Sequence, residues 1–106
     1  IGERQEQVSQ ARNNIRRLSD QISVDVEKAY RKLERTQAMM DVAREALALR
    51  REAERLSRNQ LRAGVTSNAK VAEAVAAARS AESDELQARL AHELALAEIA
   101  NIAGVR

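Results

Sequence analysis

The chain has 106 residues, of which 18 are basic, 16 acidic and one His, and it has no Cys, Pro, Trp or Phe. This length allows at most one domain. The lack of Cys excludes disulfides, zinc–thiolate sites and thiol nucleophiles, and one His cannot supply a His pair or a Ser-His-Asp triad. Basic and acidic residues alternate along the chain, and the net charge is only +2. We therefore expect no nucleic-acid partner.

Residues 3–62 contain no Gly and no Pro, which predicts one continuous helix. At 1.5 Å per residue it is about 90 Å long. A composition rich in Ala, Leu, Glu and Arg with few aromatics is typical of long helices and coiled coils. Cations stabilise the negative end of a helix dipole, and five of them stand in the last turns: Arg50, Arg51, Arg55, Arg58 and Arg62.

A turn is predicted at residues 63–68, around the only Gly between the two ends of the chain, Gly64. Gly64 fits the left-handed position that ends a helix, and Thr66, Ser67 or Asn68 can cap the next one. The second helix then covers residues 69–103, about 50 Å. Because the connection is short, the helices must be antiparallel. The predicted fold is all-α, a single coiled-coil-like helical hairpin over residues 1–106.

Apolar residues of the first helix form two rows offset by one residue, about 100° around the helix. The first seam is Ile22, Val26, Ala29, Leu33, Thr36, Met40, Ala43 and Leu47. The second seam is Met39, Val42, Ala46, Leu49, Ala53 and Leu56. A two-stranded coiled coil needs only one such row, so the first helix is expected to contact partners on two sides.

The second helix repeats this pattern with smaller residues. Its Ala seam, interrupted by Glu85 and His92, is Ala74, Ala78, Ala81, Ala88, Ala95, Ile99 and Ile102. Its Leu flank is Leu86, Leu90, Leu94 and Ala97. Thirty-five residues reach back only to about residue 25 of the first helix. The apolar row upstream, the overhang stripe, therefore needs another partner: Val8, Ala11, Ile15 and Leu18.

The tip is the one candidate functional site that the sequence offers. An exposed turn at the end of a rigid rod is a natural docking point, and an apolar residue there, Val65, has no obvious structural duty. The candidate docking residues are Arg62, Ala63, Gly64, Val65, Thr66, Ser67 and Lys70. With one interior Gly there is no phosphate-binding loop. We therefore expect no enzymatic activity, no metal and no cofactor.

Three segments carry a resemblance to the TolC-like outer-membrane efflux proteins. Residues 24–33, VDVEKAYRKL, resemble the family's Ala-Tyr-x-x-Leu segment; residues 63–67, AGVTS, with Val71 after them, resemble its turn; and residues 97–104, AEIANIAG, resemble the end of its Ala-rich return helix. Family members often carry Asp directly before the Val that follows the tip, and Lys70 stands there in this chain. This departure changes the charge of the tip.

The resemblance implies a periplasmic wall segment of an outer-membrane duct. In that family the parent protein is a homotrimer with a β-barrel in the outer membrane and an α-barrel across the periplasm, to which each subunit gives two hairpins. The tip meets a periplasmic adaptor, which links the duct to an inner-membrane pump. Docking is thereby assigned to residues 63–66, and Arg62, Ser67 and Lys70 are added by proximity. This segment itself is not expected to insert into the membrane.

Two other interpretations stay open. The first is the hairpin of the adaptor itself. Adaptor hairpins also carry Arg, Leu and Ser near the turn, as this chain does at Arg55, Leu56 and Ser57, but the β-rich flanks with Gly and Pro that usually adjoin them are missing here. The second is a generic coiled-coil scaffold. Since the chain begins with Ile1 rather than Met, we expect it to be a piece of a longer protein. The exported substrate and the pump served do not follow from the sequence.

Overall fold

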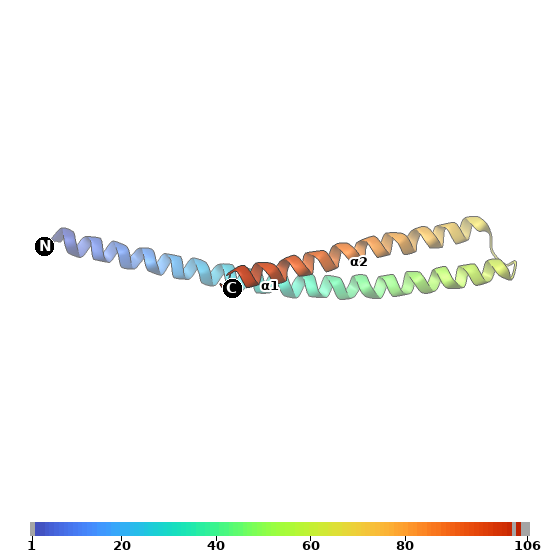
Figure 1. The fold of residues 1–106 in the computed structure, drawn as a ribbon, viewed down its shortest axis with the longest axis horizontal. Helices are drawn as coiled ribbons and strands as arrows, with labels where there is room; N and C mark the ends of the chain where they lie inside the picture. Colours follow the sequence, from blue (N-terminus) through green and yellow to red (C-terminus); the bar gives the residue numbers. More distant parts are fainter. Residues whose placement is uncertain (1, 103, 105–106) are drawn as a thin grey trace.

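The computed structural model describes residues 2–102 and 104, and it contains two helices, α1 (Gly2–Arg62) and α2 (Asn68–Ile102). They run antiparallel and form a rod of 94 × 23 × 14 Å (Figure 1). The prediction of a long all-α hairpin is confirmed. The predicted turn ends one residue earlier than expected, because Asn68 is the first residue of α2. Residue 103, the predicted end of the second helix, lies outside the described residues.

The two helices overlap only from about residue 26 of α1 to its end. The far end of α2 packs where Ile99 and Ile102 meet Val26, Ala29 and Tyr30, which together line a small cavity. Residues 2–25 of α1 extend beyond that point, and Figure 1 shows this segment in blue with no second helix beside it. The predicted overhang is therefore present.

The contact between the helices follows heptad spacing on both sides. On α1 the buried residues are Ala29, Thr36, Met40 and Leu47, and on α2 they are Val71, Ala78, Ala81 and Ala95. All four on α1 belong to the first seam; Ile22, its first member, lies beyond the reach of α2 and is 49% exposed. Three of the four on α2 belong to the Ala seam. Small residues on both helices, among them Ala29 on α1 and Ala78, Ala81 and Ala95 on α2, let the backbones approach closely.

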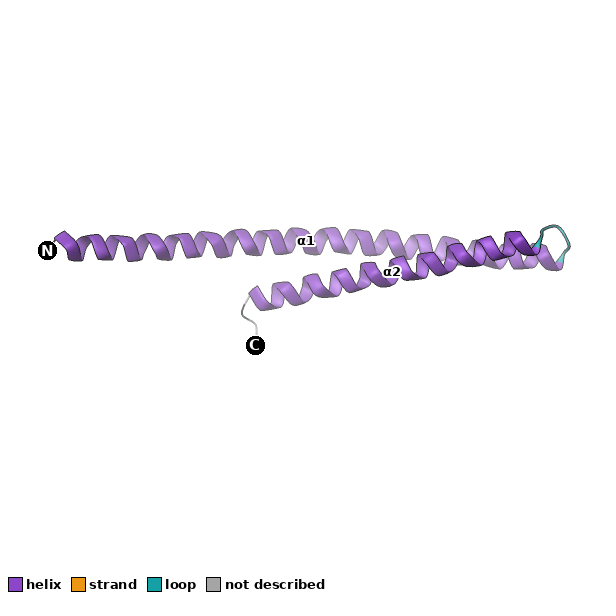
Figure 2. Cartoon of the chain, turned by 90° about the horizontal axis from the view of Figure 1, so that it is seen from above, coloured by secondary structure: helices purple, strands orange, loops and turns teal. Residues whose placement is uncertain are grey.

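The two helices also coil around each other. In Figure 1 they are separate near the tip and overlap near the end of α2, whereas in Figure 2 they overlap near the tip and separate near the end of α2. Such winding keeps a seam of 3.5-residue period in contact along its length. Neither α1 nor α2 contains, among the residues described, an apolar segment of the kind needed to cross a lipid bilayer.

Candidate functional site: the hairpin tip and the exposed seams

The end of α1 is closed by a left-handed Gly cap. Gly64 has φ +76°. Its N–H donates to the carbonyl of Leu61 (3.0 Å), and the N–H of Val65 donates to the carbonyl of Gln60 (2.9 Å). This pair of bonds is the Schellman motif, which satisfies carbonyls that have no partner within the helix. The left-handed position predicted for Gly64 is therefore observed.

The start of α2 is capped by Ser67, one of the three candidates from the sequence. Its Oγ accepts a hydrogen bond from the N–H of Lys70 (3.3 Å), and its carbonyl accepts the first helical bond, from Val71 (3.2 Å). A Ser at this position satisfies a donor in the first turn that would otherwise lack a partner. The two caps fix the turn at five residues, 63–67, and set where the tip side chains stand.

Val65 is the most exposed large apolar residue of the described chain, at 72%. In Schellman motifs the residue after the Gly usually packs on an apolar residue of the last helical turn. Here that position is Gln60, so Val65 projects without an apolar partner of this kind. A side chain in this state is available to another molecule.

The tip is also basic. Arg62 donates a 3.4 Å hydrogen bond to Asn59, and Lys70 lies 3.9 Å from Glu73 in a pair that is largely exposed. Exposed pairs at this spacing contribute little to stability, so both cations remain free to interact with a partner. The structure gathers all seven candidate residues at one end of the rod; their docking role stays a prediction.

The second seam of α1 faces solvent throughout. Its large members Met39, Val42, Leu49 and Leu56 are 57%, 67%, 67% and 48% exposed. Leu86, Leu90 and Leu94 of the Leu flank are also exposed, on the side of α2 away from α1. A hairpin has one internal contact, and the first seam and the Ala seam occupy it, so these two rows have no apolar partner among the residues that the structure describes.

The two long sides of the hairpin differ in chemistry. One side carries a largely apolar groove, lined by residues of α1 and α2 that include Ala38, Met39, Val42, Ala46 and Ala91. The opposite side carries a polar groove lined by Arg44, Arg51, Glu85 and Arg89, together with Leu47 and Ala48. The rod therefore has one apolar side and one charged side.

Ion pairs between the helices were not anticipated from the sequence. Arg44 pairs with Glu85 (3.9 Å), Arg51 with Glu82 (3.6 Å), Glu54 with Arg79 (3.6 Å) and Lys32 with Glu98 (3.3 Å). The side chains of Glu54 and Glu85 are only 15% and 14% exposed. The one signal in the sequence was that both carboxylates stand at heptad positions of the interface; which cation each of them meets depends on the relative rotation of the two helices.

A polar layer replaces apolar packing at one level of the interface. Thr36 is buried; its hydroxyl donates to the carbonyl of Leu33 (3.0 Å) and lies 3.4 Å from Nδ1 of His92. A hydroxyl has one proton, so while Thr36 donates to Leu33 its contact with His92 requires the tautomer that carries hydrogen on Nδ1. His92, which interrupts the Ala seam in the sequence, thus finds its partner on α1.

Two properties of the titratable side chains are clear in the described residues: one pair has shifted pKa values, and potential metal ligands do not cluster. No three His, Cys, Asp or Glu side chains among them gather closely enough to hold a metal ion. A hydrogen bond from Arg55 holds the pKa of Glu52 below its ordinary value of 4.5, and the same bond raises the pKa of Arg55; both side chains are more than half exposed. Their arrangement is that of a surface pair rather than of a reactive site.

Comparison with known proteins adds no relative. No family model matches the chain, and neither a curated protein nor a solved structure matches it.

Proposed function

We propose that the chain is a passive segment of the periplasmic α-helical wall of a trimeric, TolC-like outer-membrane duct. The observation that carries the proposal is the second seam of α1, exposed beside a first seam that is already occupied by α2. A helix in the wall of a ring needs one neighbour on each side, and a free-standing pair of helices has no use for the extra row.

The exposed tip supports the second part of the proposal, docking to a periplasmic adaptor. Val65 offers an apolar contact, and Arg62 and Lys70 offer charge on either side of it. The segment supplies no catalysis; a separate inner-membrane pump supplies the energy. Exposed apolar residues at the centre of a small contact, ringed by polar ones, are typical of protein interfaces.

The test uses the longer protein that contains this chain. Val65→Asp and Gly64→Val should reduce export while trimer assembly, followed by sedimentation, persists. Glu93→Gln, an exposed change on α2 far from the tip, is the control and should leave export intact. If export is indifferent to both tip variants, the docking assignment is wrong. Adjoining sequence with a second hairpin and amphipathic strands is expected for a duct, and β-rich flanks would favour the adaptor.

A coiled-coil scaffold is the second candidate, favoured by the angle between the two seams of α1. They lie about 100° apart, which suits a square bundle of four helices, whereas neighbours in a wide ring lie closer to opposite sides of each helix. The Leu flank of α2, on the side away from α1, fits the ring better. The mass of the assembled parent protein separates the two: a trimer for the duct, another stoichiometry for a scaffold.

A further inference from the structure

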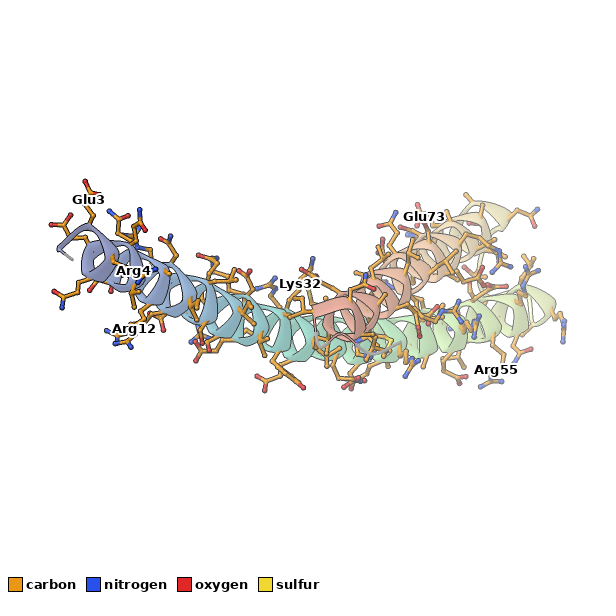
Figure 3. All side chains as sticks on the ribbon, turned by 60° about the vertical axis from the view of Figure 1, so that its left-hand side comes forward. Glu3, Arg4, Arg12, Lys32, Arg55 and Glu73 are labelled. Atoms are coloured by element: carbon orange, nitrogen blue, oxygen red, sulfur yellow. The ribbon has the colours of Figure 1, made fainter. Side chains whose placement is uncertain are left out.

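Two apolar rows on α1 lack a partner in the hairpin. The overhang stripe, extended by Ile22, lies on residues 2–25, and the second seam lies closer to the tip. The large side chains of both rows are 47–68% exposed. Figure 3 shows the overhang, marked by Glu3, Arg4 and Arg12, standing alone beyond Lys32. The overhang is thus a helix whose apolar row packs on no other helix, and the second seam borders an apolar groove that no helix of the hairpin fills.

The apolar residues of the two rows have the same spacing when one row is taken in the direction opposite to the other. Along the overhang the apolar residues are 8, 11, 15, 18 and 22, and along the second seam, from its far end, they are 56, 53, 49, 46 and 42. The steps are the same in both. In an antiparallel pair of α1 helices Val8 therefore lies opposite Leu56, Ile15 opposite Leu49 and Ile22 opposite Val42, all at once.

We propose that a second copy of this chain packs antiparallel along α1, so that the overhang of each copy fills the apolar groove of the other. Each end of the dimer then has three helices: α1 and α2 of one copy and the overhang of its partner. This goes beyond the proposed function. It uses the same second seam that a ring neighbour would use, but it places the two tips at opposite ends, so a molecule in the dimer cannot at the same time stand in a ring.

Charge at the groove agrees with this occupant. Asp84 is its only acidic lining residue, and among the residues that the structure describes Asp84 makes no ion pair. It lies across the groove from Ala46, which faces Leu18 of the second copy in the register given above. Arg16 and Arg17 stand beside Leu18, one on each flank of the overhang stripe. One of the two therefore reaches the level of Asp84.

The contact is also large enough for a stable dimer. Residues 2–25 extend about 36 Å, and a helix is about 10 Å across. Two such contacts, counted on both partners, bury about 1,400 Å², within the range of about 1,200–2,000 Å² found for stable interfaces. Both contacts form at once, because in this register the two α1 helices overlap over their whole length.

Disulfide cross-linking tests the arrangement against a background free of native Cys. Ile15→Cys and Leu49→Cys are made as separate proteins, each checked for helix content by circular dichroism, and mixed under mild oxidation. The proposal predicts a strong Ile15→Cys/Leu49→Cys hetero-cross-link and little cross-link within either protein alone, since like positions are about 50 Å apart in the dimer. Cross-linking within each protein alone means parallel neighbours; it overturns the dimer and leaves the duct proposal standing.

A second measurement keeps the proposal falsifiable without Cys. Sedimentation of the unmodified chain should give the mass of a dimer, and Asp84→Arg should weaken dimerisation about tenfold. Glu93→Arg, an exposed charge change on α2 that is not among the groove-lining residues, is the matched control and should leave the mass unchanged. A monomer at all concentrations, or equal effects of the two variants, overturns the proposal.

Discussion

Replacing Gly64 with Ala should destabilise the hairpin through the backbone alone. An added Cβ at Gly64 meets nothing within 4 Å, so no steric clash contributes. The φ of +76° is left-handed, a conformation that costs an L-residue about 1–2 kcal/mol. For a domain near this size, 1 kcal/mol corresponds to a fall in melting temperature of about 4–8 °C.

Thermal unfolding followed by circular dichroism at 222 nm measures the effect. Gly64→Asn should lose less than Gly64→Ala, because Asn tolerates the left-handed conformation better than most residues. Gly2→Ala is the control: Gly2 also has open space around a Cβ, but it has no left-handed φ. If Gly64→Ala and Gly2→Ala melt alike, the left-handed cap does not limit the stability of the turn.

Three further predictions concern the interface and the surface. Ala78→Leu, at a position with 0% exposure, should push the helices apart and cost about 1–3 kcal/mol in urea unfolding, whereas Ala97→Leu on the exposed flank should cost almost nothing. Thr36→Val should cost about 1 kcal/mol because the Nδ1–H of His92 loses its acceptor, and Thr36→Ser should retain most of the stability. The hydrogen bond from Arg55 lowers the pKa of Glu52, so the pair stabilises the fold above pH 4.5, and this stabilisation is lost as the pH falls through the folded pKa of Glu52. Glu52→Gln should therefore remove a small part of the dependence of the free energy of unfolding on acid pH. An unchanged dependence at acid pH would contradict this prediction.

The hairpin could be predicted from breakers and periodicity because both signals are local. Gly64 and Ser67 determine where α1 ends and α2 begins through bonds within a few residues. The residues of the first seam buried against α2 are those at the predicted spacing, and the exposure of Ile22 agrees with the expectation that the second helix reaches back only to about residue 25.

The polar contacts between the helices could not be predicted in the same way. Whether Glu85 pairs with Arg44 or with another cation depends on the relative rotation of two rods, and a period alone does not give that rotation. The same holds for His92, whose position in the Ala seam was visible but whose partner, Thr36, lies 56 residues away. The sequence shows where a polar residue interrupts the seam, and the packing of the two helices determines which residue it contacts.

The small core of the hairpin explains why its remaining apolar rows matter. Half of the eight buried residues in the described part of the chain are Ala, which contribute little apolar surface compared with Leu or Met. A rod that keeps its larger side chains Met39, Val42, Leu49 and Leu56 in solvent leaves much of its available hydrophobic stabilisation unused. Either proposed association, with a wall helix of a duct or with the overhang of a second copy, would recover it. The stability of the chain should therefore rise with its concentration, because a partner that binds only the folded state stabilises it by mass action.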